Sequence, residues 1–254
     1  MKADQPAQSL LKAQRKLIIL PVGACEQHGP YLPIDTDLRI AQLIAEKLES
    51  KTTENECLLL PAIPFSCSWE HKGTGTIALS HTTIVSIIHD IAYNLKAWAD
   101  PNLFILLNWH GGNNFLSSLA AEITAKENIP TIAVNAISET SMMWARKHRE
   151  DDIDDIHAGG LETAIIKAYW PDLVDNNIPK SAKYQVPVSP SIMHFALQAF
   201  NTRSITRDGI WGDPSLAKAE EGKDVIEKVT QNIYNNINEV LTFMDKVKDP
   251  GEQL

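Results

Sequence analysis

The stretch KLIILPVG (residues 16–23) predicts a β-strand that is buried on both faces, because it is a continuous apolar run rich in branched side chains. Pro21 and Gly23 mark its end. Similar apolar runs recur downstream at residues 58–63, 103–107 and 131–134. The sequence therefore predicts four short buried strands.

Helical patterns separate these runs. From Thr36 onward, apolar residues recur at spacings of three and four, as expected for one face of a helix. A second such stretch runs from about Thr82 to Trp98, and a third opens near Asn113. Buried strands that alternate with amphipathic helices indicate βαβ crossovers. We therefore expect a three-layer α/β/α sandwich with a mainly parallel central sheet.

The length of 254 residues is compatible with one α/β domain over residues 1–254. Within it we distinguish an N-terminal extension (residues 1–15), a loop-rich insertion (171–213) and a C-terminal helix (214–246). The insertion is rich in Pro, Asn, Ser and Gly and is a candidate cover for a functional site. Asp213 is the expected N-cap of the last helix, with Pro214 at its first position.

Composition argues against several classes of partner. The formal net charge is −9 without a dense Lys/Arg cluster, which disfavours nucleic acids and acidic membranes. The N-terminus lacks the apolar stretch of a signal peptide, and no run of about eighteen apolar residues occurs. Cys25, Cys57 and Cys67 show no CxxC spacing, so we expect neither a disulfide framework nor a structural zinc site. These features predict a soluble, cytoplasmic protein.

Two polar motifs lie between the first predicted strand and the first turn of the helix that follows it. Glu26 and His28 stand two residues apart directly after the first strand, where an extended backbone would point both to one side as a ligand pair. Asp35 and Asp37 follow where the helix begins, and either can also cap it or interact with its dipole. Capping suits Asp35 or Thr36 better, which leaves the Asp37 carboxylate free.

Two further motifs follow the third and fourth strands. His110, Gly111 and Gly112 lie at the end of the third strand, and functional groups gather beyond the carboxyl ends of strands in open α/β sheets. The glycines would let the backbone approach a ligand, with amides available for an anion or a polarised carbonyl oxygen. His157 and Glu162 again lie beside small residues, as candidates for an acid–base group and a further carboxylate ligand.

These residues form a mixed set of imidazoles and carboxylates, which suits zinc, manganese or iron better than calcium or copper. A shared aspartate can hold two ions about 3.5–4 Å apart and so generate a hydroxide for hydrolysis. On spacing alone, structural or surface roles for each residue stay open alternatives. A phosphate loop is disfavoured, because neither the Lys-Ser/Thr of a P-loop nor a GxGxxG motif is present.

Several other residues have less specific interpretations. We expect structural or surface roles for the remaining histidines, His71, His81, His89, His148 and His194. The acidic cluster at residues 151–155 is expected to be solvated, although its place before His157 leaves a role at the edge of the site open. Four of the tryptophans, Trp69, Trp109, Trp144 and Trp211, are either packing residues or part of a pocket wall, and both alternatives stay open.

The segment LPVGACEQHGPYLPIDTD (residues 20–37) resembles the signature of the creatininase family. The segments NWHGGN, HAGGLET and GIWGDPSLAKAEEGK are similar to later blocks of that family in the same order. SWEHKGTGTIALS (residues 68–80) resembles its substrate-side loop. The resemblance spans about residues 17–225 and implies a three-layer α/β fold, two divalent ions per subunit, and a homohexamer that hydrolyses the amide C–N bond of a small molecule, often a cyclic amide or a formamide.

The resemblance also implies residue roles. Glu26, Asp37 and His110 are similar to ligands of one ion, and His28 with bridging Asp37 to ligands of the second. Glu162 would support the second site or coordinate directly, with a part in catalysis, and His157 resembles a proton shuttle to the leaving nitrogen. Candidates for contacts with the substrate or its oxyanion are Trp109, Gly111 and Gly112.

One position departs from the creatininases proper, which carry a metal-binding Glu where this sequence has Gly112. The HGGN form is more similar to the branch with formamide deformylases of flavin and deazaflavin biosynthesis and peptidases of mycofactocin maturation. An alternative is a catalytically silent protein of the same fold that binds a metal or a metabolite. Gly112 favours that alternative, whereas the intact residues Glu26, His28, Asp37 and His110 disfavour it.

Overall fold

The computed structural model describes residues 6–12, 17–53, 56–99, 101–148, 155–179, 192–206 and 208–248. The strands are β1 (Leu17–Val22), β2 (Cys57–Leu59), β3 (Leu103–Asn108) and β4 (Thr131–Asn135). The helices up to residue 150 are α1 (Ala7–Lys12), α2 (Thr36–Glu49), α3 (His81–Trp98), α4 (Leu116–Glu127) and α5 (Ala136–Lys147). The later helices are α6 (Gly160–Tyr169), α7 (Met193–Ala199), α8 (Thr202–Ile205) and α9 (Ala219–Lys248).

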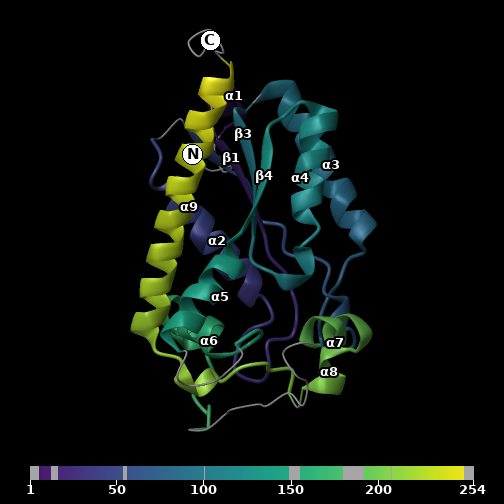
Figure 1. The fold of residues 1–254 in the computed structure, drawn as a ribbon, viewed down its shortest axis with the longest axis vertical. Coiled ribbons are helices and arrows are strands. Elements are labelled where there is room, and N and C mark those ends of the chain that lie inside the picture. Colours follow the sequence, from purple (N-terminus) through teal and green to yellow (C-terminus); the bar gives the residue numbers. More distant parts are fainter. Residues whose placement is uncertain are drawn as a thin grey trace.

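The four strands form one parallel sheet in the order β2-β1-β3-β4 (Figure 1). β1 pairs with both of its neighbours, with Leu17 opposite Cys57 on one side and Leu103 on the other. All six residues of β1 and of β3 are buried, as their apolar runs require. The predicted parallel sheet is confirmed.

Side chains of β1 alternate between two apolar cores. Leu17 and Ile19 pack in one core with α2, α5, α6 and α9, while Ile18 and Leu20 pack in the other with α3 and α4. The helices therefore cover both faces of the sheet, and the long helix α9 runs along the outside of one layer (Figure 1). This arrangement confirms the three-layer α/β/α sandwich.

The order of the strands creates a crevice. α2 connects β1 to β2 on one face, whereas α3 and α4 connect β2 to β3 and β3 to β4 on the other. The direction of winding thus reverses between β1 and β3. Segments that leave the carboxyl ends of these two neighbouring strands diverge there, which is where ligands bind in open α/β sheets.

Two predicted boundaries are wrong in detail. The run at residues 58–63 is paired as a strand only over β2, followed by an isolated bridge between Val22 and Ile63. The helix expected from Pro214 is split. The Asp213 side chain caps a short 3-10 turn at Pro214–Leu216. Extended backbone at Ala217 then separates this turn from α9.

The described parts of the loop-rich insertion contain a 3-10 turn at Pro171–Leu173 and the short helices α7 and α8, and no strand. Of the N-terminal extension, residues 6–12 are described and contain α1. Within the described chain, no helix is long and apolar enough to cross a membrane.

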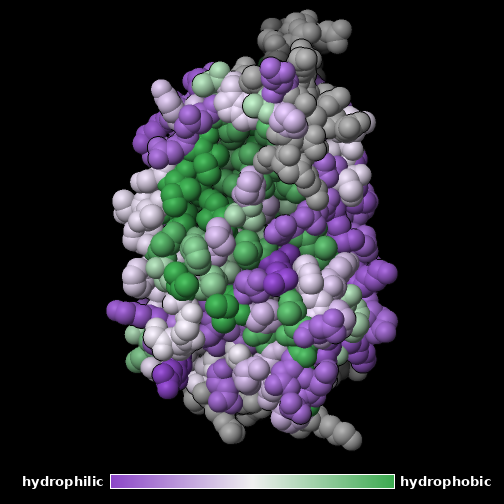
Figure 2. All heavy atoms as spheres, turned by 180° about the vertical axis from the view of Figure 1, so that it is seen from behind, coloured by the Kyte–Doolittle hydropathy of each residue, from purple (hydrophilic) through white to green (hydrophobic). Residues whose placement is uncertain are grey.

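The view from behind shows a broad apolar area on the surface (Figure 2). The structure also has a groove of about 440 Å³ between β2 and α3, and its lining includes Leu60, Ile91 and Trp98.

Candidate metal centre

Five predicted ligands converge in the crevice. Glu26 and His28 follow β1, Asp37 lies in the first turn of α2, His110 follows β3, and Glu162 lies in the first turn of α6. All five are buried, with at most 5% of any residue exposed. Buried charges of this density require partners, because an unpaired charge away from water is costly.

Asp37 lies between the two imidazoles. Its Oδ1 is 3.3 Å from Nε2 of His28, and its Oδ2 is 3.2 Å from Nδ1 of His110. Glu26 Oε1 approaches the same nitrogen of His110 to 3.3 Å, and Glu162 Oε2 lies 3.6 Å from Nε2 of His28. The cluster therefore has two halves that share one carboxylate.

Backbone carbonyls orient both rings. Nδ1 of His28 lies 3.1 Å from the carbonyl oxygen of Glu26, and Nε2 of His110 lies 2.9 Å from that of Cys67. Since a carbonyl only accepts, each ring donates an N–H outward and turns its other nitrogen toward the carboxylates. Histidines that bind metals are held in this way.

Opposite charges dominate the ionisation of the cluster. Burial raises the pKa of Glu26, but His110 outweighs that effect and holds the pKa well below its usual range. Burial likewise opposes the shift of Glu162, yet His28 lowers its pKa to about 2. Burial lowers the pKa of His28, but Asp37 and Glu162 raise it well above its usual value. The buried carboxylates therefore stabilise positive charge at the centre of the cluster.

The donors fit a divalent metal. Three buried atoms of the cluster have no hydrogen-bond partner among the described residues, namely Glu26 Oε2, His28 Nε2 and Asp37 Oδ2. Glu26, His28 and Asp37 each offer a ligand atom within 4.8 Å of the others. Mixed nitrogen and oxygen donors of this kind suit zinc, manganese or iron.

A pocket of about 360 Å³ opens over the cluster. Its wall includes Glu26, Asp37, His110, His157 and Glu162. The remaining lining residues come from several loops and helices and are Glu70, His71, Gly111, Gly112, Asn114, Ile137, Ile156, Gln198, Thr202 and Trp211. Gln198 and Thr202 belong to α7 and α8, so the predicted insertion contributes one side of the pocket.

Predicted His157 lies at the rim of the cluster. Its Nδ1 is 3.6 Å from Oε1 of Glu26, and its Nε2 is 2.7 Å from the carbonyl oxygen of Gln27. Burial lowers its pKa, and the adjacent His28 lowers it further. The next residue, Ala158, has a left-handed backbone with φ of 53°, and its N–H donates to Oε2 of Glu162. This short turn thus positions both His157 and Glu162.

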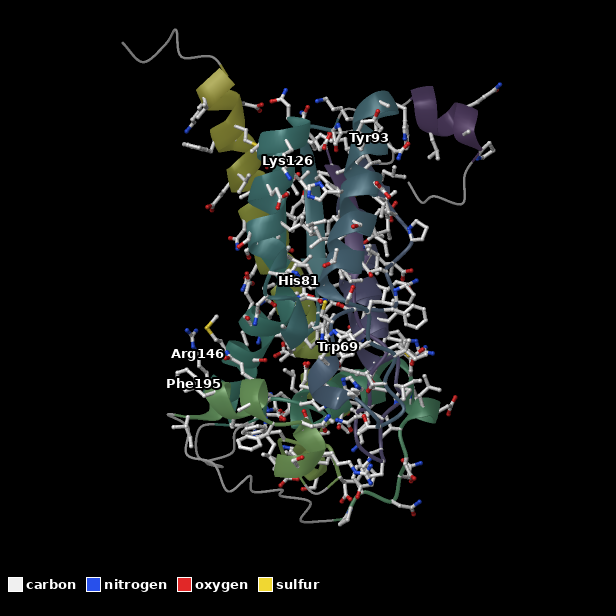
Figure 3. All side chains as sticks on the ribbon, turned by 90° about the vertical axis from the view of Figure 1, so that its right-hand side faces the viewer. Trp69, His81, Tyr93, Lys126, Arg146 and Phe195 are labelled. Carbon is white, nitrogen blue, oxygen red and sulfur yellow. The ribbon has the colours of Figure 1, made fainter. Side chains whose placement is uncertain are left out.

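Trp109 does not line the pocket, contrary to its assignment as a contact for the substrate. It is fully buried in the core, and its Nε1 donates to Oε1 of Glu162 at 3.2 Å. Of the other tryptophans, Trp211 lines the pocket, Trp144 is in the core, and Trp69 is half exposed on the α3–α4 side of the molecule (Figure 3). The strand end that presents His110 also sends Trp109 inward.

His71 was assigned to structural or surface roles, yet it is buried beside the cluster, with Nε2 3.8 Å from Oε1 of Glu26. Burial, with His157 nearby, lowers its pKa to about 3. Glu70, the residue before it, also faces the pocket. The resemblance of residues 68–80 to a substrate-side loop was the available signal, although it does not distinguish individual residues.

Three other histidines lie away from the cluster. His81, which is labelled in Figure 3, begins α3 and packs against Phe115. His89 and His148 pair with Glu122 and Glu221. The side chain of His194 lies outside the described residues, as do residues 151–154 of the acidic cluster. Asp155 was expected to be solvated, but its Oδ2 accepts from the N–H of Leu161 at 2.7 Å at the start of α6.

The family model described as "Creatininase: Creatinine amidohydrolase" matches residues 3–237. The chain belongs to the creatininase family. Among curated relatives, a mycofactocin precursor peptide peptidase of Mycolicibacterium smegmatis is 26% identical over 227 residues, or 87% of this chain and 84% of the relative. A creatinine amidohydrolase of Pseudomonas putida is 21% identical over 249 residues, or 88% and 89% of the two chains.

Solved creatininases share the fold. A mutant creatininase described as Zn-Zn type superposes with a TM-score of 0.79 at 16% identity, and a structure described as "Creatininase Mn" with 0.78 at 17%. Each comparison covers 94% of this chain and 98% of the other. The relatives named here are a peptidase and an amidohydrolase, and this chain is a member of their family with a cluster of potential metal ligands.

Proposed function

We propose that this protein is a metal-dependent hydrolase that cleaves an amide C–N bond with activated water. The proposal rests on the position of the Asp37 carboxylate, which directs one oxygen to each of two buried imidazoles. Such a shared carboxylate is the feature expected of a two-ion site. The names of the zinc and manganese creatininases support the same proposal.

Glu26, Asp37 and His110 would hold one ion, and His28, Asp37 and Glu162 the other. Ions bound there would lower the pKa of a water molecule and polarise the substrate carbonyl. Glu162 suits a ligand role, because Trp109 and Ala158 donate to its two oxygens and fix the carboxylate beside His28. Gly112 offers no side chain, so Glu162 is the carboxylate that joins Asp37 in this half of the cluster.

His157 is placed to move the proton. Its Nε2 donates to the carbonyl of Gln27, which leaves the Nδ1 lone pair facing the pocket. That nitrogen accepts a proton from the attacking water and returns it to the departing nitrogen. The lowered pKa keeps the ring neutral and ready to accept near pH 7. Gly111 and Gly112 line the pocket, and their backbone N–H groups are candidates to hold the carbonyl oxygen.

The substrate class is proposed to be a small cyclic amide or a formamide. A pocket of about 360 Å³ is of the size that encloses a small molecule. A second candidate is an amide bond in a peptide, which the similarity to mycofactocin precursor peptide peptidases favours. Both candidates use the same water activation and differ in what fills the pocket.

Elemental analysis of protein purified without added metal tests the centre. We expect about two equivalents of zinc, manganese or iron in the parent and little in Asp37→Ala. Asp35→Ala is the matched control, because Asp35 lies two residues away and pairs with Arg39. A parent without metal, even after reconstitution with each ion, would refute the proposal and leave a catalytically silent binding protein as the better explanation.

A hydrolysis screen follows with formamides, cyclic amides and short peptides, on the metal-loaded protein. His157→Ala should keep its metal content and lose turnover by roughly 10²–10⁴-fold, the usual contribution of a general acid–base group. Full activity in that variant would show that another group carries the proton.

We also propose that the protein is a single-domain homohexamer located in the cytoplasm. The oligomer is supported by the family resemblance, and sedimentation of the purified protein would measure it directly.

A further inference from the structure

Gln27 stands between the proposed ligands Glu26 and His28 in the sequence. Its side chain is surrounded by polar groups of Gly29, His71, His157 and Gly209. Its amide oxygen accepts from the N–H of Gly29 at 2.9 Å, and its amide nitrogen donates to the carbonyl of Gly209 at 3.1 Å. One partner can only donate and the other can only accept. The orientation of the amide is therefore fixed by the backbone.

The same amide nitrogen has a second hydrogen, and two histidine nitrogens compete for it. Nδ1 of His71 lies at 2.8 Å and Nε2 of His157 at 3.0 Å. Nε2 of His157 is also 2.7 Å from the carbonyl oxygen of Gln27 itself, and that contact requires a proton on Nε2. His157 is then a donor, so the amide hydrogen goes to His71.

Both rings acquire a defined tautomer from this one residue. His71 accepts at Nδ1 and must carry its proton on Nε2, which lies 3.8 Å from Oε1 of Glu26. His157 carries its proton on Nε2 and turns the Nδ1 lone pair toward the pocket. The two rings lie against each other with centroids 4.4 Å apart, so neither can rotate freely without displacing the other.

The Gln27 amide is closely packed against the backbone at Gly209. Gln27 is 9% exposed. Gly209 has φ of +80°, and a Cβ placed there would lie 1.9 Å from the Gln27 amide oxygen. The chain therefore brings a glycine against this amide at the point where a side chain would displace it.

We propose that Gln27 is a positioning residue that fixes the tautomers of His71 and His157, through its side chain for the first ring and its backbone carbonyl for the second. His71 thereby directs an N–H toward Glu26 and helps to orient that carboxylate, while His157 offers Nδ1 for proton transfer. The catalytic consequence rests on the proposed hydrolase function, whereas the tautomers do not.

The test is a long-range ¹H–¹⁵N spectrum of protein labelled with ¹⁵N-histidine, recorded without metal and after loading with zinc. The protonated and bare nitrogens of a neutral imidazole have distinct shifts, and spectra of His71→Gln and His157→Gln assign the two rings. In the parent we expect the proton on Nε2 of both. A proton on Nδ1 of His71 would overturn the proposal.

Two variants separate side chain from backbone. In Gln27→Glu the side chain can no longer donate, so His71 should move its proton to Nδ1, whereas His157 should stay unchanged. In Gln27→Met, His71 should show a mixture of tautomers, and zinc affinity should fall by roughly 10–100-fold, as for other residues that orient metal ligands. Gln42→Met, on the exposed side of α2, is the control and should match the parent.

An unchanged His71 tautomer in either variant would contradict the proposal. Should Gln27→Glu fail to fold, the parent and Gln27→Met still decide it. Neither measurement needs a substrate, so failure of the amide screen would count against the proposed function and not against this assignment.

Discussion

Gly112 lies where the backbone leaves no space for a side chain. A Cβ at this position would come within 2.0 Å of the carbonyl oxygen of Cys67 and 2.5 Å of Nε2 of His110. These are the two atoms whose hydrogen bond turns Nδ1 of His110 toward Glu26 and Asp37. The glycine is therefore a condition for the orientation of a proposed ligand.

We predict that Gly112→Ala separates His110 from Cys67 and weakens zinc binding by at least about 10-fold, as is usual when a ligand loses its orienting partner. The neighbouring Gly111→Ala is a close control, because a Cβ there meets nothing within 4 Å. Zinc affinity would be measured by competition with a chelator. Equal affinity in the two variants would show that the backbone adapts and that the contact at Gly112 is unimportant.

Asp155 is a half-buried carboxylate outside the cluster. Burial raises its pKa, against the hydrogen bond from Leu161, to about 7, and Glu162 adds to the increase. The folded state thus holds this proton more tightly than the unfolded chain, whose reference pKa is 3.8. The stabilisation is fully present below about pH 4 and is lost as the pH rises toward 7.

The side chain in Asp155→Asn does not ionise, so this variant should keep its stability while the parent loses stability between pH 4 and pH 7.5. The free energy of unfolding of the variant minus that of the parent should therefore increase over this range, by up to about 4 kcal/mol. Urea unfolding of metal-free protein across this range would measure the difference. Asp172→Asn, on an exposed residue, is the control for the substitution itself. A difference between Asp155→Asn and the parent that does not vary with pH would show that Asp155 titrates in the ordinary range.

At the scale of elements, α6 connects the site to the core. Its first turn holds Glu162, and its body packs against α9 around Gly222. A Cβ on Gly222 would lie 2.2 Å from the carbonyl oxygen of Ala164. The two helices therefore approach at a distance that only glycine permits, and this approach fixes how far α6 reaches into the crevice.

Gly222→Ala should accordingly destabilise the protein by roughly 1–3 kcal/mol, the usual effect of overpacking. The sign is the informative part, because the same change in an exposed helix stabilises by up to about 1 kcal/mol. Thermal unfolding would measure it, with the exposed neighbour Lys223→Ala as a control that should change little. A stabilised Gly222→Ala would mean that α6 and α9 can separate without cost.

At the scale of the whole molecule, the cluster of proposed metal ligands is expected to couple metal binding to stability. Each ion held at 100 times its dissociation constant contributes about 2.7 kcal/mol to the folded state. In a chain of this size that corresponds to an increase in Tm of about 5–10 °C per site. Zinc should therefore raise the Tm of the parent and of Asp35→Ala, and removal by a chelator should reverse the increase. A similar increase in Asp37→Ala would place the binding elsewhere.

The sequence was most informative where a property is local. The apolar run at residues 16–23 is sufficient to predict a buried strand, and the end of a strand is sufficient to place Glu26 and His110 at one edge of the sheet. The direction of a side chain after a strand is not local. Trp109 and His110 are adjacent, yet one enters the core and the other the crevice.

The residues that sequence reasoning missed owe their roles to distant partners. Gln27 depends on Gly209, 182 positions away, and His71 depends on Gln27, 44 positions away. Neither the periodicity nor the spacing of the chain contains such pairings. The 3-10 turn before α9 was missed for a different reason, since Asp213 and Pro214 are as suitable for starting a 3-10 turn as for starting an α-helix.

The proposed ligands come from four separate segments between Glu26 and Glu162. During synthesis, the amino-terminal ligands leave the ribosome long before the last carboxylate exists, and they cannot form the complete cluster until α6 has been made and packed. Under the proposed function, the complete site would load metal only after α6 has packed. The identity of the bound ion would then depend on the metals available to the cell at that moment as well as on the ligands.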